Sequence, residues 1–153
     1  MEQQIYRLHP EIPQVPDSLF TTQVDEVKSI PNLFFPEFPL ESPMRKYSVH
    51  DAPKEMYEWA QDYFRLNNLA VRYQIVRPGM RIHKDVNRDW CYNYLITSGD
   101  GETVWYEDDK TTVKKSVVIP EKTWHWINTS VFHTVRNIQE DRLAITVFED
   151  HDN

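Results

Sequence analysis

The sequence has little cysteine, since Cys91 is the only one among 153 residues. A single cysteine cannot form an internal disulfide, which excludes the disulfide-stapled secreted scaffolds and suits a reducing compartment. The first residues lack the apolar run of a secretory signal, and no later stretch is long and apolar enough for a membrane-spanning helix. From these absences we expect a cytoplasmic protein without a membrane partner.

Basic residues are few relative to acidic ones, with 17 Lys and Arg against 24 Asp and Glu and a net charge of −7. This balance disfavours a general phosphate-binding surface, so a nucleic acid partner is not expected. The chain is 40% hydrophobic and can therefore build one core. We find no internal repeat or low-complexity segment and expect a single domain over residues 1–153.

The segment 1–45 differs in composition from the rest, because it holds seven of the ten prolines. Proline at that density prevents regular helix and central strand. The same segment carries Leu19, Phe20 and a further apolar cluster at 33–38. That is too much apolar surface for a free tail, so we expect an extended arm that wraps around the domain.

Residues 51–67 predict one helix. Asp51 is a good N-cap, and Pro53 suits the first turn. A single apolar stripe recurs at steps of three and four, formed by Met56, Trp59, Ala60 and Tyr63. We expect this stripe to pack on the back of a sheet.

Residues 70–150 change to a period of two and predict a β-rich core. The expected strands are short and separated by turn residues, at 71–77, 80–85, 91–97, 103–107, 112–119, 123–127, 132–138 and 142–149. No helical stretch interrupts them, so a parallel βαβ fold is disfavoured. The pattern predicts a mainly β fold, an antiparallel sandwich or jelly roll, with the 51–67 helix on one sheet.

Two histidines and one carboxylate suggest a metal site within this core. His83 and Asp85 are two residues apart in an expected strand and therefore project from the same face. His133 follows 48 residues after Asp85, a separation sufficient for about four strands to return the chain alongside. Two imidazoles and a carboxylate are the ligands that hold non-haem Fe(II) while leaving positions open.

Arg142 lies nine residues after His133 and begins an alternating strand. The alternation places Arg142, Ala144 and Thr146 on one face and three apolar residues on the other. A buried arginine without a partner is costly, so Arg142 needs an anion, and a guanidinium can hold a carboxylate through two hydrogen bonds. The four residues together suggest an iron enzyme that uses a keto acid.

Each feature also has a structural explanation. An H-x-D triplet alone is often a surface coincidence. Arg142 could pair with a nearby acid, namely Glu140, Asp141 or Glu149. His125 is an alternative to His133 as the distal ligand, because Arg136 follows it by eleven residues.

Residues 71–149 resemble the Fe(II)/2-oxoglutarate-dependent dioxygenases, and among them the prolyl-hydroxylase-like branch. The matching segments are Tyr73, His83-Lys84-Asp85, Tyr92-Asn93-Tyr94-Leu95, Gly101-Glu102-Thr103, His133 and Arg142-Leu143-Ala144-Ile145-Thr146-Val147. The resemblance implies a double-stranded β-helix of jelly-roll type. It also implies decarboxylation of 2-oxoglutarate to succinate and CO2, with O2, Fe(II) and supporting ascorbate, coupled to hydroxylation of an unactivated C–H bond.

Residue by residue, the resemblance implies that His83, Asp85 and His133 hold Fe(II). Arg142 would take the distal carboxylate of 2-oxoglutarate with help from the hydroxyl of Tyr94. Tyr73 would lie near the other end of the co-substrate.

The sequence does not identify the substrate, because proteins of the family that it resembles modify prolyl residues, other peptides, amino acids and small molecules. Two other interpretations of the sequence remain. One is a non-enzymatic or differently reactive cupin-like protein that binds a metal or small ligand. The other is a structural jelly roll in which the metal ligands are accidental. Arg88 and Trp90, in the stretch after the metal motif, are candidates for substrate contact.

Overall fold

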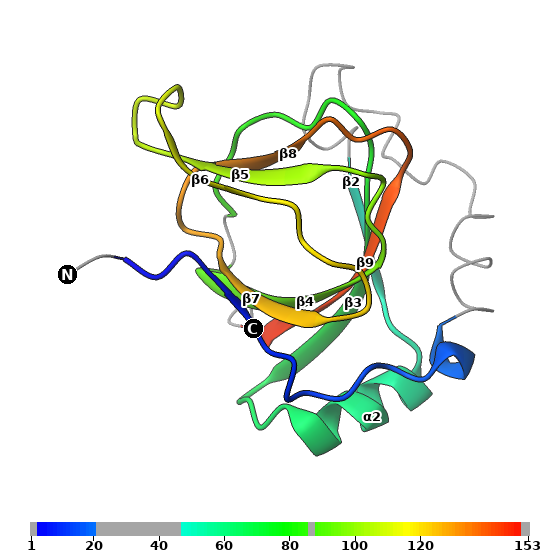
Figure 1. The fold of residues 1–153 in the computed structure, drawn as a ribbon. Helices are drawn as coiled ribbons and strands as arrows, with labels where there is room; N and C mark the ends of the chain where they lie inside the picture. Colours follow the sequence, from blue (N-terminus) through cyan, green and yellow to red (C-terminus); the bar gives the residue numbers. More distant parts are fainter. Residues whose placement is uncertain (1–2, 21–46, 86–87, 151–153) are drawn as a thin grey trace.

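The computed structural model describes residues 3–20, 47–85 and 88–150 and shows a mainly β fold (Figure 1). Within these residues, the α-helix α2 spans Lys54–Tyr63 and a short 3-10 helix, η1, spans Asp17–Leu19. The strands within the described residues are β1 (Tyr6–Leu8), β2 (Tyr47–Asp51), β3 (Leu69–Val76), β4 (Trp90–Thr97), β5 (Glu102–Tyr106), β6 (Val113–Val117), β7 (Trp124–Asn128), β8 (His133–Arg136) and β9 (Arg142–Glu149).

The strands form two antiparallel sheets. The larger sheet has the order β1-β7-β4-β9-β3-β2, and the smaller sheet has the order β6-β5-β8. An isolated bridge between His83 and His133 adds the segment around His83 to the free side of β8. From β3 onward the chain therefore crosses repeatedly between the two sheets, which is the winding of a double-stranded β-helix, or jelly roll. The expected fold class is confirmed.

The larger sheet has one face toward α2 and one toward the smaller sheet (Figure 1). Its outer face packs against Met56 and Ala60 of α2, both fully buried in the main apolar cluster. The β9 residues in that cluster are Leu143, Ile145 and Val147. The predicted alternation of β9 is therefore confirmed, because its other face is left to Arg142, Ala144 and Thr146, which point between the sheets.

The helix is shorter than predicted and begins differently. Asp51 ends β2 instead of capping the helix, and its carboxylate pairs with Arg72 at 3.0 Å. Pro53 occupies the N-cap position without a side-chain hydrogen bond. At the other end, Phe64 is already extended, so the predicted 51–67 span overestimates the helix at both termini. The edge pairing of β2 with β3 competes for Asp51 and determines the boundary.

The described part of the proline-rich segment, residues 3–20, lies against the larger sheet. β1 pairs with β7 at the edge of the sheet, before the first proline of the chain. Further along, Val15 and Phe20 join the core beside α2, and the Trp124 indole donates to the carbonyl of Pro13 at 3.1 Å. The remainder of the predicted arm, 21–45, lies outside the described residues.

Most predicted strands differ from the observed ones by a few residues, and β9 agrees at both ends. The main difference is at 80–85, which forms a single bridge instead of a strand. Within the described residues, β1 and β2 were not predicted, because edge strands of three and five residues show little alternation.

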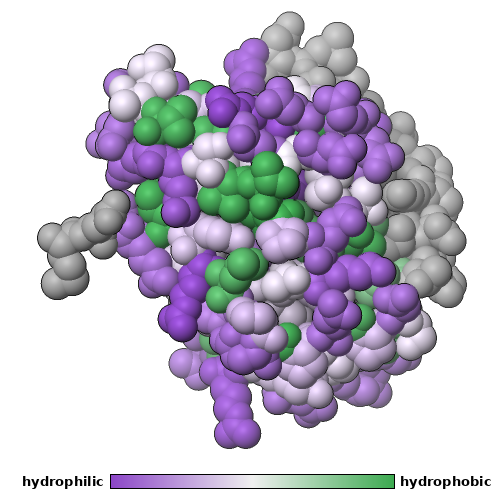
Figure 2. Space-filling model, viewed as in Figure 1, coloured by the Kyte–Doolittle hydropathy of each residue, from purple (hydrophilic) through white to green (hydrophobic). Residues whose placement is uncertain are grey.

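No helix in the described part of the chain has the length and apolarity needed to cross a membrane. Figure 2 shows that the hydrophobic residues on the viewed face lie in separate patches among hydrophilic ones. Among the described residues, the fold gathers a set of polar side chains between the sheets, where the site described below lies.

Candidate metal centre

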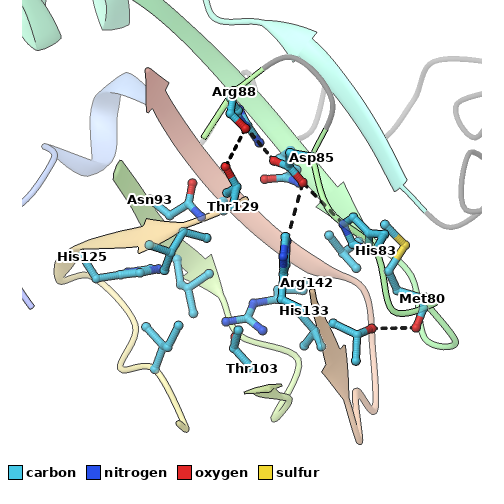
Figure 3. A pocket seen from close by; sticks show the side chains of 18 residues that line it. Met80, His83, Asp85, Arg88, Asn93, Thr103, His125, Thr129, His133 and Arg142 are labelled. Carbon is cyan, nitrogen blue, oxygen red and sulfur yellow. Dashed lines mark hydrogen bonds and ion pairs between the residues drawn. The ribbon is translucent and has the colours of Figure 1, made fainter. Parts of the chain in front are cut away.

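His83, Asp85 and His133 come together at one end of the space between the sheets (Figure 3). Each can offer one ligand atom, and these atoms lie within 4.8 Å of one another. The Nε2 atoms of both histidines lie 3.5 Å from the same oxygen of Asp85, Oδ1. The structure therefore brings together the three residues that the sequence indicated as metal ligands.

The backbone fixes the orientation of both imidazoles. Nδ1 of His83 is hydrogen-bonded to the carbonyl of Arg81 at 2.7 Å, and Nδ1 of His133 to the carbonyl of Val131 at 2.7 Å. A carbonyl can only accept, so each Nδ1 carries a proton and each Nε2 is free to offer its lone pair when the ring is neutral. This is the second interaction that metal-binding histidines normally make.

Arg88 holds the second oxygen of the carboxylate. Its Nε donates to Oδ2 of Asp85 at 2.9 Å, and its guanidinium carbon lies 4.5 Å from the centre of the Phe148 ring. The pKa of Asp85 is strongly lowered. Burial acts to raise it, but hydrogen bonds from His133 and His83 and the charge of Arg88 outweigh that effect. Asp85 is thus an ionised carboxylate with one oxygen directed at the histidines.

The pKa of His83 is shifted in the opposite direction. Burial lowers it, but the hydrogen bond and charge of Asp85 and the carbonyl of Arg81 outweigh burial, and the net pKa is raised. The metal-free site therefore attracts a proton for the same reason that it would attract a cation.

Thr129 connects the metal segment to the turn after β7. Its hydroxyl donates to the carbonyl of Arg88 at 2.9 Å, and its carbonyl accepts from the amide of Asp85 at 3.0 Å. Its amide donates to the carbonyl of Asp89 at 2.8 Å. A single buried threonine thereby fixes the short stretch that carries a metal ligand and its arginine partner.

The metal ligands open into a cavity of about 70 Å³ between the sheets. It is lined from the larger sheet by Gln74, Val76, Asn93, Leu95, His125, Ile127, Arg142 and Ala144, and from the smaller sheet by Thr103, His133, Thr134 and Val135. The cavity therefore suits a small ligand.

Arg142 reaches this cavity from β9 and is 5% exposed. Its Nη1 is buried without a hydrogen-bond partner, and no carboxylate in the described residues forms an ion pair with it. Burial lowers the pKa of Arg142 to about 10, which leaves it protonated at neutral pH. The alternative that Arg142 pairs with Glu140, Asp141 or Glu149 is not observed, and the guanidinium is available to an anion.

His125 enters the same cavity from β7 but does not join the metal group (Figure 3). The structure places His133, and not His125, beside the other two ligands. His125 is 1% exposed, and its Nδ1 has no hydrogen-bond partner. Burial and then the charge of Arg142 lower the pKa of His125 to about 3, and interaction with the backbone of Thr123 opposes this shift only in part.

Tyr73 and Tyr94 do not line the cavity, so their positions do not support the expectation that they contact the co-substrate there. Both belong to the apolar cluster on the outer face of the larger sheet, and Tyr73 donates to the carbonyl of Leu19 at 3.1 Å. The reason is strand parity, because Asn93 and Leu95 face the cavity, and Tyr94 between them must face α2.

Sequence reasoning missed Thr129 and assigned Arg88 only a tentative contact with substrate. The position of Arg88, three residues after Asp85, is a weak signal, since Trp90 and other polar residues are equally close in sequence. No sequence signal indicates that Thr129 would hydrogen-bond back to residues 40 positions earlier. His125 carried a signal, an arginine eleven residues later, but its side chain lies at a different end of the cavity from the metal ligands (Figure 3).

Comparison with known proteins gives similarity of fold only. No family model and no curated protein matches the chain. Among solved structures, an oxalate decarboxylase has 17% identity and a TM-score of 0.46 over 76% of this chain and 29% of that chain. A second, on the Mn(II) centres of Bacillus subtilis oxalate decarboxylase, has 16% identity and a TM-score of 0.45 over 78% and 30%. The chain thus spans under a third of these proteins. They are not 2-oxoglutarate enzymes, and at this level of similarity their activity does not transfer.

Proposed function

We propose that this protein is an Fe(II)- and 2-oxoglutarate-dependent oxygenase that hydroxylates an unactivated C–H bond of a small-molecule or peptide substrate. The observation that carries the proposal is the pairing, in one cavity, of a two-histidine, one-carboxylate group with a buried arginine that has no anion. The first element fits a metal with open positions, and the second fits a keto acid that carries a distal carboxylate.

The residues present fit a divalent metal. His83 and His133 are oriented with Nε2 toward the shared oxygen of Asp85, and their Nδ1 atoms are already committed to backbone carbonyls. Nitrogen and oxygen ligands of this kind suit Fe(II) and also Mn(II). When bound, the metal would activate O2 for the oxidative decarboxylation of 2-oxoglutarate and the hydroxylation that accompanies it.

The residues also fit the co-substrate. Leaving a guanidinium buried and unpaired costs several kcal/mol, on the order of the loss when one partner of a buried ion pair is removed. A carboxylate would satisfy Nη1 of Arg142 and restore that loss. Because the metal ligands and Arg142 line the same cavity, a dicarboxylic keto acid could contact both, with its keto acid end at the metal (Figure 3).

The remaining cavity residues orient the co-substrate and exclude water. The cavity lining includes the apolar side chains of Leu95, Ile119, Ile127 and Ala144. Low polarity there strengthens the arginine–carboxylate pair. The small volume leaves no room for a peptide beside a co-substrate, so we infer that the substrate reaches the metal from the mouth of the cavity.

The alternative is a differently reactive cupin-like protein that binds a metal and another small anion. The same metal group and the same arginine would serve it. The solved structures of similar fold are oxalate decarboxylases by their titles, and one title names Mn(II) centres. The discriminating property is the affinity for 2-oxoglutarate relative to other small acids.

The test is calorimetry followed by turnover. The protein loaded with Mn(II) is titrated with 2-oxoglutarate, succinate and oxalate in turn, and the protein with Fe(II), ascorbate and O2 is assayed for succinate release. We expect metal-dependent binding of 2-oxoglutarate and slow succinate formation that increases with a substrate. Binding of oxalate in preference to 2-oxoglutarate, with no succinate formed, would favour the cupin-like alternative.

A further inference from the structure

His125 is the second polar group that the cavity holds without a partner. It is 1% exposed, its Nδ1 has no hydrogen-bond partner, and the described residues that share its cavity include no acid besides Asp85. Asp85 is already held by Arg88 and the two metal-site histidines. The described residues therefore leave a buried ring nitrogen of His125 unsatisfied, and a buried polar atom that lacks a partner and faces a cavity points to a ligand.

His125 lines the cavity together with Arg142 and is not one of the metal ligands. The two residues stand on β7 and β9, with β4 between them, and both side chains enter the same cavity (Figure 3). The charge of Arg142 acts on His125 strongly enough to contribute to its altered titration. A ligand that satisfied only the guanidinium would leave the imidazole unpaired and buried, at a cost of about one lost hydrogen bond.

We propose that His125 is a second anchor for the anion that Arg142 binds, donating a hydrogen bond from its imidazole to the same carboxylate. The proposal rests on the proposed function for the identity of the anion, 2-oxoglutarate, and replaces Tyr94, which faces the other side of β4. His125 becomes a positioning and selectivity residue that favours a keto acid with a distal carboxylate over one without it.

The charged groups around His125 determine its protonation state in the empty cavity and how its hydrogen bonding changes when an anion binds. Arg142 on β9 faces it, His9 lies near it on the N-terminal segment, and the Tyr6 ring on β1 has its centroid 5.9 Å from that of His125. These groups offer no negative charge to an imidazolium, so the ring is neutral in the empty cavity. A bound carboxylate would supply a hydrogen-bond acceptor and offset the charge of Arg142, and both effects favour N–H donation by His125.

The test compares two keto acids on three proteins. The wild type, His125→Phe and His125→Asn, each loaded with Mn(II), are titrated with 2-oxoglutarate and with pyruvate, which has no distal carboxylate. We expect His125→Phe to weaken 2-oxoglutarate binding about tenfold to a hundredfold, the effect of one hydrogen bond to a charged group. Pyruvate and Mn(II) binding should not change, and His125→Asn, which retains a donor, should recover part of the loss.

Equal weakening of both keto acids by His125→Phe would overturn the proposal, because it would indicate general damage to the cavity. Unchanged 2-oxoglutarate binding would overturn it as well, while leaving the oxygenase function intact. If the wild type itself binds no 2-oxoglutarate, the proposed function fails and this inference fails with it.

A second measurement uses only the wild type, so its result does not depend on whether the variants fold. Histidine-selective ¹⁵N spectra of the Zn(II)-loaded protein report the hydrogen bonding of each imidazole. We expect 2-oxoglutarate, but not pyruvate, to shift the His125 signals to those of a hydrogen-bonded N–H. Identical His125 signals with both ligands would overturn the proposal.

Discussion

Arg88 holds one oxygen of the Asp85 carboxylate and leaves the other oxygen directed at the two metal-site histidines. Arg88 Nε lies 2.9 Å from Oδ2, while Oδ1 lies 3.5 Å from Nε2 of each metal-site histidine. With Oδ2 occupied by a guanidinium, the carboxylate is held in a single orientation and presents one oxygen to a metal. A site prepared in this way loses less side-chain entropy when the metal binds.

The first prediction concerns this arginine. Arg88→Gln should weaken Mn(II) binding about tenfold to a hundredfold, the usual effect of removing a group that orients a metal ligand. The matched control is Arg72→Gln, which removes an arginine paired with Asp51 and Asp150 away from the cavity. Calorimetric titration with Mn(II) measures both, and equal affinities for Arg88→Gln and wild type would show that Asp85 is oriented without Arg88.

The second prediction concerns the identity of the distal histidine. His133→Ala should abolish measurable Mn(II) binding and 2-oxoglutarate decarboxylation, because it removes one of three protein ligands. His125→Ala should bind Mn(II) like the wild type and retain part of the decarboxylation. The reverse result, metal loss in His125→Ala alone, would transfer the ligand role to His125.

The third prediction concerns pH. Metal binding requires neutral imidazoles, and the raised pKa of His83 means that this ring keeps its proton to a higher pH than a free histidine. Affinity for Mn(II) should therefore increase as the pH rises through and above about 6.5, the ordinary histidine pKa. Proton release on binding, measured by calorimetry in buffers of different ionisation enthalpy, should decrease over the same interval. Affinity that is constant from pH 6 to 8 would contradict this prediction.

The fourth prediction corrects the sequence-based expectation for Tyr94. Because its side chain packs in the outer core beside Phe20 and Trp124, Tyr94→Phe should leave the dissociation constant of 2-oxoglutarate unchanged. The comparison with His125→Phe, made in the same titration, separates the two faces of the larger sheet. A weakening specific to Tyr94→Phe would mean that the tyrosine hydroxyl reaches the ligand after all.

The accuracy of sequence reasoning varied with the strength of the local pattern. The bounds and facing of β9 could be predicted because Leu143, Ile145 and Val147 alternate with smaller or polar residues over eight positions. β4 has apolar residues on both faces, so periodicity could not decide whether Tyr94 or its neighbours face the cavity. The resemblance supplied a role for Tyr94 but not the face on which it lies.

Pairing between residues far apart in the sequence was the other reason that the prediction failed in places. Asp51 has the side chain of a helix N-cap, but the pairing of β2 with β3 places it opposite Arg72 instead. The stretch 80–85 alternates like a strand, yet only His83 completes a bridge, and Asp85 is held by the Thr129 carbonyl. These outcomes depend on residues 20 to 50 positions away, which no window of sequence contains.

The last prediction concerns Arg142, the residue on which the proposal of a keto acid co-substrate depends most. Arg142→Ala should weaken 2-oxoglutarate binding by about 2–5 kcal/mol, thirtyfold to several-thousandfold, because the distal carboxylate would be buried without its charge partner. Arg142→Lys should lose most of this affinity as well, since an ammonium lacks the planar pair of donors. Mn(II) binding should stay close to wild type in both variants, because neither removes a metal ligand.

The apo stability of the Arg142 variants gives an independent check on the same residue. Arg142 is 5% exposed and its Nη1 is buried without a partner, so an apolar replacement of similar length, Arg142→Met, should fold with stability equal to or greater than the wild type while losing 2-oxoglutarate binding. Urea unfolding without ligand measures the stability, and titration of the manganese form measures the binding. A destabilised Arg142→Met would indicate that the arginine serves the fold. An Arg142→Met protein that folds and binds 2-oxoglutarate as well as wild type would leave a cupin-like protein for another small ligand as the better account of this cavity.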